Sequence, residues 1–429
     1  MAEPTESKTS GMLRAMSVVR SSLAVLVLLA GASLPARAEA PFVPVAAAPS
    51  AADQEARARL AAEWPVIELV TMGIGSLIWE RHGHIVLCVR HPDPRRDLCY
   101  NYGIGDFRRP LQMGWGFFRG TNSFWAGADS PADMLAIYRY TDRTIWSQAL
   151  PLTAEQKQKV IAKLQRDVLE ENKYYSYDHF WDNCTTRVRD ILDDATGGQL
   201  RAQKATGEPD HRTIRALARE GFYGMRLPLL ITDLAMGRVT DRQPTYYERM
   251  FLPQYMRQAA QQLWGAEPRV LYQRRGPPEL EDGPSGRGLL ALVLLALGLP
   301  VVLAQWRGRF LRTALTVTLL PQVLLGLAFW ALAVISPLSY VRYNESCLIF
   351  LPLDFLMVVL PAALARKYAR ARVGMLVVIA ALLAVGVLKQ PLWAALLGPL
   401  VPALAVGFWP RKMAAAPRAP ADPKRKPKR

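Results

Sequence analysis

The sequence predicts an exported α+β domain followed by an all-α transmembrane bundle of about five helices. Three observations support this prediction. An apolar run at residues 21–34 precedes an ordinary mixed segment, and the chain after residue 287 is strongly apolar. The mixed segment, about 245 residues, is long enough to bury a sizeable core.

The N-terminal apolar run is typical of a signal peptide. Arg14 and Arg20 precede it, and Ala36-Arg37-Ala38 has the small-x-small pattern of a cleavage site. We therefore expect a signal peptide at residues 1–38 and an Ala/Pro-rich linker at 39–64. An uncleaved anchor is the alternative. Either way the next domain is exported to an oxidising compartment, where cysteines can pair.

The exported domain is expected at residues 65–265, with a linker at 266–287. Strands followed by helices favour an α+β arrangement. Asp182 or Asn183 could cap the helix that begins at Cys184, and Asp210 could cap a later helix. The expected strands are 65–72, 84–90 and 97–102, and the expected helices are 153–171, 184 to about 194, and one near 211–220.

The second and third strands form a hairpin whose register can be derived. If the turn centres on Asp93-Pro94, Cys88 lies opposite Cys99, and His84 shares their face with Asn101. Two hypotheses follow: a cross-strand disulfide between the two cysteines, and a hydrogen bond between His84 and Asn101. The alternative for the cysteines is two free buried thiols.

The region 288–410 contains five apolar segments near the length that a bilayer requires: 288–305, about 313–335, about 347–365, 373–388 and 391–409. The positive-inside rule orients them, because Lys and Arg cluster after the first segment, after the third, and in the tail 411–429. These clusters, which include Arg307, Arg309, Arg312, Arg366, Lys367, Arg370 and Arg372, carry +3, +4 and +7 of the net charge of +17. The exported domain is thus expected in the periplasm, at the bacterial inner membrane, and the tail in the cytoplasm. The nearly neutral remainder gives no sign of nucleic-acid binding.

Cys184 is the residue that suggests chemistry. At a helix N-terminus, free N–H groups and the helix dipole favour a thiolate, which is the reactive form of cysteine. His84 starts a strand and could exchange the proton, while Asn101 could orient its ring. Together they form a papain-like set in permuted order, with the histidine before the cysteine. Both residues could instead be packing residues.

Zinc is a competing hypothesis, with His82, His84, His179 and Cys184 as ligands. No carboxylate or second cysteine stands at a standard zinc spacing. We therefore expect no metal and no cofactor.

Three stretches, WERHGHIVL, YNYGIGDF and YSYDHFWDNCTTRVRDIL, resemble the N-terminal periplasmic domain of the Lnb-type lipoprotein N-acyltransferases over roughly residues 65–260. The Asn-Cys at a helix start is also similar to lecithin:retinol acyltransferase and to permuted NlpC-like enzymes. The resemblance implies a permuted papain-like fold, a nucleophile at Cys184 and a base at His84. The supporting positions that it implies are Glu80, Asn101, Asp182, Asn183 and Arg187.

The activity implied is acyl transfer from a phospholipid, through a thioester, to the N-terminus of a lipoprotein. Backbone N–H groups at the start of the Cys184 helix could hold the oxyanion. A Cys/His hydrolase of peptidoglycan peptides or lipid esters is the first alternative, and a non-enzymatic envelope module is the second.

Four other features have simpler interpretations. Asp354 lies inside the third apolar segment, where an acid is a functional candidate or a contact with interfacial water. Cys347 is expected to pack in the membrane. The aromatic group Trp115, Phe117 and Phe118 could line an acyl groove but is typical of a core. The tyrosine pairs at 174–175 and 246–247 are interpreted as packing.

Overall fold

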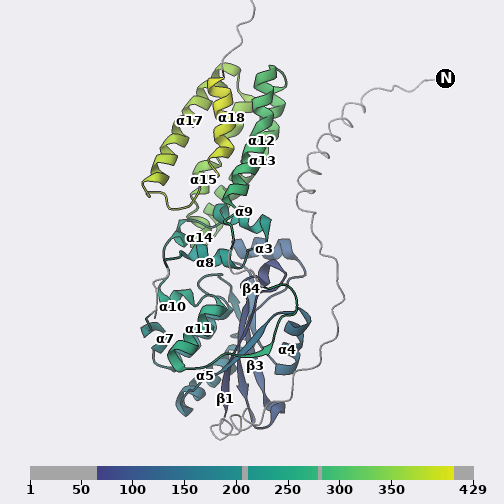
Figure 1. Cartoon of the computed structure of the whole chain (residues 1–429), viewed down its shortest axis with the longest axis vertical. Coiled ribbons are helices and arrows are strands. Elements are labelled where there is room, and N and C mark those ends of the chain that lie inside the picture. The colour runs from purple at the N-terminus through teal and green to yellow at the C-terminus, as the bar shows by residue number, and fades with distance from the viewer. Residues whose placement is uncertain (1–64, 205–210, 279–282, 410–429) are drawn as a thin grey trace, which may run out of the picture. The chain divides into compact units, whose positions relative to one another are not determined.

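The computed structural model of the chain describes residues 65–204, 211–278 and 283–409 (Figure 1). The expected signal peptide, the linker at 39–64, the basic tail and the possible cap Asp210 lie outside these residues.

The N-terminal domain contains a seven-stranded, fully antiparallel sheet with strand order β6-β4-β3-β2-β1-β5-β7. The strands are β1 Val66–Met72, β2 His84–Arg90, β3 Leu98–Ile104, β4 Ser123–Asp129, β5 Ile145–Ala149, β6 Tyr174–Ser176 and β7 Arg269–Tyr272. The first three match the sequence prediction closely. The other four were not predicted, and β7 falls inside the expected linker at 266–287, so the boundary at residue 265 was wrong. β7 is a short edge strand with two exposed residues, which leaves little apolar alternation to detect.

The predicted hairpin register is confirmed. Val86 pairs with Asn101 and Cys88 with Cys99. Asp93 caps a short 3₁₀ turn, η2 Pro94–Arg96, by accepting a hydrogen bond from the Arg95 N–H.

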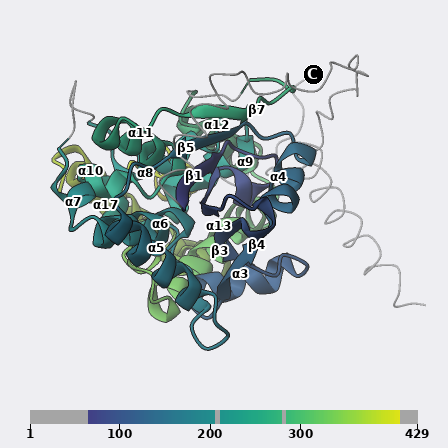
Figure 2. The ribbon, with the colours of Figure 1, turned by 90° about the horizontal axis from the view of Figure 1, so that it is seen from below.

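Helices cover both faces of the sheet (Figure 2). One face buries Ile67, Leu69, Ile85 and Leu87 against helices α5, α6 and α11. The other face, which includes Val86 and the paired cysteines, packs against Met134 of α4. The helices of this domain are η1 Ile78–Glu80, α3 Pro110–Phe118, α4 Pro131–Tyr140, α5 Ala154–Asp167, α6 Cys184–Ala195, α7 Gln199–Ala202, α8 Ile214–Glu220, α9 Arg226–Ala235, η3 Arg238–Asp241, α10 Tyr246–Arg249 and α11 Pro253–Trp264.

Local sequence explains where the three predicted helices begin. Thr153 and Gln156 form a capping box for α5, which ends at Asp167 rather than near residue 171. Asn183, not Asp182, caps α6. α8 begins after a Thr213 cap, whose hydroxyl accepts from the Ala216 N–H.

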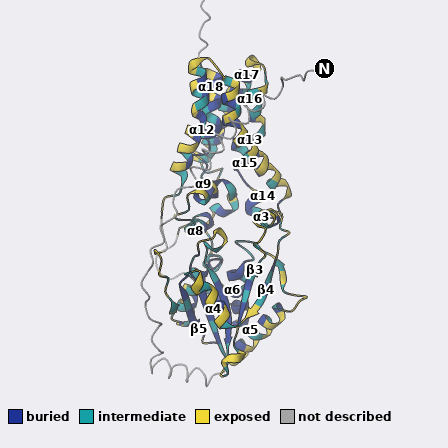
Figure 3. Cartoon of the chain, turned by 90° about the vertical axis from the view of Figure 1, so that its right-hand side faces the viewer, coloured by how far each residue is buried: buried dark blue, intermediate teal, exposed yellow. Residues whose placement is uncertain are grey.

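The C-terminal helical region contains four longer helices among the described residues: α12 Arg287–Arg307, α13 Leu311–Ile335, α17 Ala362–Ala384 and α18 Leu397–Phe408. Of these, α12 and α13 are long and apolar enough to cross a membrane. Many exposed residues lie along these helices (Figure 3), as expected for surfaces that face lipid. The first half of α17 carries Arg366, Lys367, Arg370 and Arg372.

The predicted bundle of five continuous helices is not found. The expected third span is broken into α15 Ser346–Ile349, η4 Pro352–Phe355 and α16 Leu356–Val359, after a short α14 Ser339–Arg342. Pro352 and Pro361 explain part of the break, because proline removes a backbone donor and clashes with a helical turn. The expected fourth span is the second half of α17, and α18 begins only at Leu397.

The broken segment, which comprises α15, η4 and α16, nevertheless runs from one hydrophobic cluster of the helical region to another. Cys347 packs with Phe329 and Leu376, whereas Met357 packs with Ala314 and Ala365. The chain therefore passes from the level of the α13 C-terminus to the level of its N-terminus.

Candidate functional site

Cys184 is the first residue of α6 and is 8% exposed. Its surroundings depend on Gly103, which has a φ of +83° and lies in the irregularity of the β3–β4 pairing. A Cβ placed at Gly103 would lie 3.7 Å from the Cys184 Cβ and 3.7 Å from the Tyr175 hydroxyl. Glycine permits this left-handed conformation, so the strand bends beside the thiol without placing a side chain there.

His84 is oriented by Asn101, as predicted. The distance from His84 Nε2 to Asn101 Oδ1 is 2.7 Å, so Nε2 carries the proton and donates it, and Nδ1 is left as the acceptor. The ring stacks on Tyr138 at a centroid distance of 5.9 Å. Burial and the nearby positive charge of Arg143 lower the pKa of His84 to about 4, so the imidazole is neutral at physiological pH.

The thiol and the imidazole meet at the same end of β2 from opposite faces. His84 lies on the face covered by α4, while Cys184 packs in the cluster of the opposite face. The N–H of Ile85, the next residue after His84, lies close enough to the sulfur to lower the pKa of Cys184. In the described residues no hydrogen bond joins the thiol to the ring, a contact that free enzymes often form only with substrate bound.

At the start of α6 the expected thiolate was wrong, and the expected set of oxyanion donors is reduced. Burial outweighs the helix terminus and raises the pKa of Cys184 above its ordinary value of 9.0, so the thiol rather than the thiolate is favoured. The Thr185 and Thr186 N–H groups both donate to Asn183 Oδ1 and are not available for an oxyanion. The Cys184 N–H, which has no hydrogen bond within the described ranges, is the donor that remains.

The four supporting residues have structural roles. Glu80 accepts from the Leu77 N–H and closes its own loop. Asp182 holds Arg187 through two hydrogen bonds of 2.6 and 2.8 Å. Asn183 caps α6 and donates through its amide to the His179 and Phe251 carbonyls.

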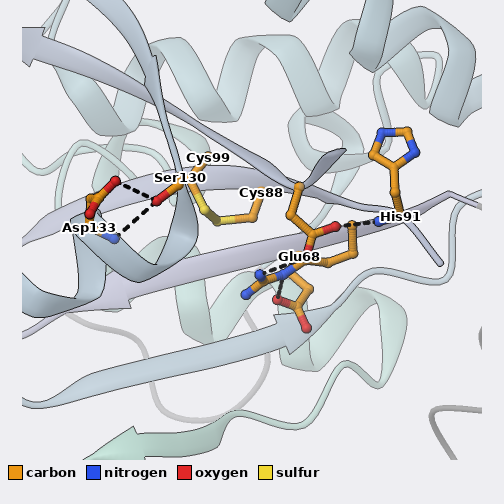
Figure 4. Close-up of a disulfide and its surroundings, with 8 residues drawn as sticks. Glu68, Cys88, His91, Cys99, Ser130 and Asp133 are labelled. Atoms are coloured by element: carbon orange, nitrogen blue, oxygen red, sulfur yellow. Dashed lines mark hydrogen bonds and ion pairs between the residues drawn. A yellow bond between two sulfur atoms is a disulfide. The ribbon is translucent and has the colours of Figure 1, made fainter. Parts of the chain in front are cut away.

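A disulfide joins Cys88 and Cys99 across the hairpin, as hypothesised (Figure 4). It lies on the same sheet face as His84, and it leaves Cys184 and Cys347 as the free cysteines of the described chain.

The matched family is consistent with this site. Residues 52–220 match the family model described as the Lnb N-terminal periplasmic domain. The similarity covers this segment and not the rest of the chain. The match includes every site residue from Glu80 to Arg187, and it confirms the resemblance seen in the motifs. No curated protein and no solved structure matches the chain.

The Lnb domain does not bring the proposed zinc ligands together. His82 bonds the Ala218 carbonyl and packs edge-on against His179, whereas His84 turns to Asn101. Across residues 65–204, 211–278 and 283–409, no three His, Cys, Asp or Glu side chains are grouped to hold a metal.

Sequence reasoning missed four residues around the thiol of the Lnb domain: Tyr138, Arg143, Tyr175 and Tyr177. Tyr175 and Tyr177 stand two positions apart in the quoted YSYDHF motif, and strand alternation would have placed them on one face. Nothing local marks Tyr138 or Arg143, because α4 and β5 bring them to the site from a distant segment.

An aromatic path leads from the surface of the Lnb domain to Cys184. Trp79 stacks on Phe107 at 4.8 Å, and Phe107 lies 6.4 Å from Phe124. Phe124 in turn lies 4.6 Å from Tyr177, whose ring is 3.4 Å from the position of a Cβ on Gly103. A cavity of about 600 Å³ opens beside Phe124, between α3 and the arginines that precede it.

Proposed function

We propose that the protein is a membrane-tethered thiol acyltransferase with a permuted papain-like catalytic domain. It moves an acyl chain from a phospholipid, through a thioester on Cys184, to an amine at the N-terminus of a bacterial lipoprotein. The family match is consistent with a membrane protein that modifies lipoproteins. The partners are therefore a phospholipid donor and a lipoprotein acceptor.

The observation that carries the proposal is the position of Cys184. It lies at the inner end of the series of aromatic contacts, and the N–H of Ile85, the residue that follows the neutral imidazole of His84, approaches its sulfur. A nucleophilic thiol needs a base, and the free Nδ1 of His84 can be that base. The aromatic rings that surround this side of the thiol suit contact with an acyl chain better than with a polar peptide.

The outer end of the path favours a lipid donor. Leu77, Ile78 and Trp79 are each nearly half exposed, and Leu111 and Trp115 of α3 are 90% and 52% exposed. Apolar residues exposed in a group typically mark a contact with lipid or a partner.

Of these residues, those of α3 lie on the side of the domain that meets the helical region. After α3 the chain turns at Gly120, and a Cβ there would lie 2.5 Å from Pro337, two residues beyond the end of α13. Phe117 and Phe118 pack with Tyr340 in one cluster, so their interpretation as core residues was right, whereas for the exposed Trp115 it was wrong.

The reaction proceeds through two balanced transfers. The Cys184 thiol gives its proton to His84 Nδ1, and the sulfur attacks the ester carbonyl carbon, whose π electrons move to oxygen. The intermediate collapses to a thioester, and the leaving alkoxide takes the proton from the imidazolium as lysophospholipid departs. The lipoprotein amine then attacks the thioester, and His84 takes its proton while the thiol reforms.

The orientation of the chain follows from the same proposal. The exported domain lies in the periplasm and the C-terminus in the cytoplasm of the inner membrane, with the broken segment completing five crossings. Arg307, Arg309 and Arg312 between α12 and α13 then face the cytoplasm, as the positive-inside rule requires.

Mass spectrometry of a lipoprotein N-terminal peptide tests the proposal. The host lacks its own N-acyltransferase and carries the wild type, Cys184→Ala, or Cys347→Ala as the control for loss of a buried thiol. A third acyl chain is expected with the wild type and the control only. Two chains in every sample would exclude this acceptor, and free fatty acid released from labelled phospholipid would instead favour a hydrolase.

A further inference from the structure

Tyr175 has a hydroxyl group whose proton has no acceptor among the described residues. The oxygen is buried, and the Gly103 N–H approaches it closely enough to act on the pKa of this tyrosine, but no described residue accepts from the O–H. An unpaired buried polar atom is costly, and such atoms occur often where a ligand completes the hydrogen bonding. The interpretation of this tyrosine as simple packing is therefore insufficient.

The Tyr175 hydroxyl lies beside the nucleophile. The Tyr175 hydroxyl and the Cys184 Cβ each lie 3.7 Å from the same point, the position of a Cβ on Gly103. Any side chain at Gly103 would separate these two groups, so the glycine that bends β3 also keeps the space between them open.

The ring of Tyr175 is held firmly. Its backbone pairs with Phe124 across β6 and β4, and the Arg187 guanidinium stacks on the ring 3.5 Å from its centre. Arg187 is itself fixed by two hydrogen bonds from its guanidinium to Asp182. These two residues, nominated by the motif, therefore act as positioning residues for Tyr175.

We propose that the Tyr175 hydroxyl and the Cys184 N–H together stabilise the oxyanion that forms when the Cys184 sulfur attacks the ester carbonyl, and again when the amine attacks the thioester. This inference rests on the proposed acyl transfer and names the second donor that it needs, since the Thr185 and Thr186 N–H groups are occupied. When the sulfur–carbon bond forms, the carbonyl π electrons move to oxygen, and the two donors point at that charge. The phenol stays protonated throughout and donates a neutral hydrogen bond.

The pKa of Tyr175 is consistent with a hydroxyl that donates a hydrogen bond and does not release its proton. Burial and the nearby Cys184 raise the pKa of Tyr175 above its ordinary value of 10.0, so the hydroxyl keeps its proton at physiological pH. The buried position also strengthens the hydrogen bond, because water does not screen it.

The test compares Tyr175→Phe with Tyr102→Phe in the full-length protein. Tyr102 is the matched control, because its buried hydroxyl already donates to Asp167 at 2.9 Å. Single-turnover release of lysophospholipid from labelled phosphatidylethanolamine measures acylation. Alkylation of Cys184 by iodoacetamide measures the thiol alone, since that reaction forms no oxyanion.

Tyr175→Phe is expected to slow acylation by about 10²- to 10³-fold, the effect of removing one oxyanion donor. Alkylation should change by less than about twofold, and the melting temperature should fall less than in Tyr102→Phe, because the Tyr175 O–H has no acceptor to lose. Tyr102→Phe should lower the melting temperature and leave acylation near wild type.

Three results would count against the inference or its basis in different ways. Acylation by Tyr175→Phe within about twofold of wild type, with Cys184→Ala inactive, would refute the tyrosine donor and leave the proposed function intact. Equal losses of acylation and alkylation would also refute it, because they would indicate a disturbed site. Acyl transfer by Cys184→Ala would overturn the proposed function itself.

Discussion

Raising the pH is expected to accelerate alkylation of Cys184 steeply, without the plateau typical of a thiolate–imidazolium pair. Burial raises the pKa of this thiol above 9.0, so less than about 1% of it is ionised at pH 7. The pKa of His84 is lowered to about 4, so no imidazolium is present to stabilise the thiolate near neutrality. The rate should therefore rise about tenfold for each pH unit from about pH 6 to about pH 8, as the thiolate fraction does.

The assay uses iodoacetamide and mass spectrometry of the peptide that contains Cys184. A Cys347→Ala background removes the other free thiol of the described chain. The absolute rate should be slow, because Cys184 is only 8% exposed and the reagent must reach it.

A rate independent of pH between about pH 5 and about pH 8 would refute this reasoning, because it would require a preformed ion pair. Acceleration of the same reaction by a non-hydrolysable phospholipid would indicate instead that lipid binding uncovers the thiol.

Three further outcomes are expected. Asn101→Ala should lower kcat about 10- to 100-fold with little change in KM, because the His84 Nε2 proton loses its acceptor; unchanged steady-state kinetics would contradict this role. Asn183→Ala should destabilise the domain by roughly 2–4 kcal/mol, from the lost cap and two carbonyls without donors, whereas Asn183→Asp should keep the cap; unfolding in detergent measures both. Replacing Cys88 and Cys99 with alanine should cost about 3 kcal/mol for the loop they close, and reductant should then have no further effect on unfolding.

The parts of the fold that the sequence revealed are those with local patterns. The hairpin could be derived because apolar alternation and a proline-containing turn together set its register, and the disulfide and the His84–Asn101 contact followed from that register. Strands β6 and β7 are three and four residues long, too short to show a period. Their places in the sheet depend on long-range pairing, which residue spacing does not record.

The same distinction between local patterns and long-range structure applies to the candidate site. The motif identified Cys184, His84 and Asn101, and the cap residue Asn183 could be read from its type and position. The protonation state could not, since it depends on how deeply the folded chain buries the thiol. Tyr175 was named as packing because an unsatisfied hydroxyl is a property of three-dimensional surroundings.

The third apolar segment of the helical region is held by a residue that lies outside it, Arg372 of α17. Where the helix breaks, the guanidinium of Arg372 donates to the carbonyls of Leu348 and Ile349 and pairs with Asp354 at 2.8 Å. Asp354 therefore has a structural contact, and Arg372 is buried rather than part of an exposed basic cluster.

This arrangement has a consequence for biosynthesis. Residues 346–360 precede Arg372 in the chain and leave the ribosome before it, so the broken segment emerges with carbonyls that nothing yet binds. In the proposed membrane orientation it cannot enter lipid alone, because hydrocarbon offers no hydrogen bonds to those groups. The segment and α17 must leave the insertion machinery together, and a chain truncated before α17 should be recognised as defective and degraded.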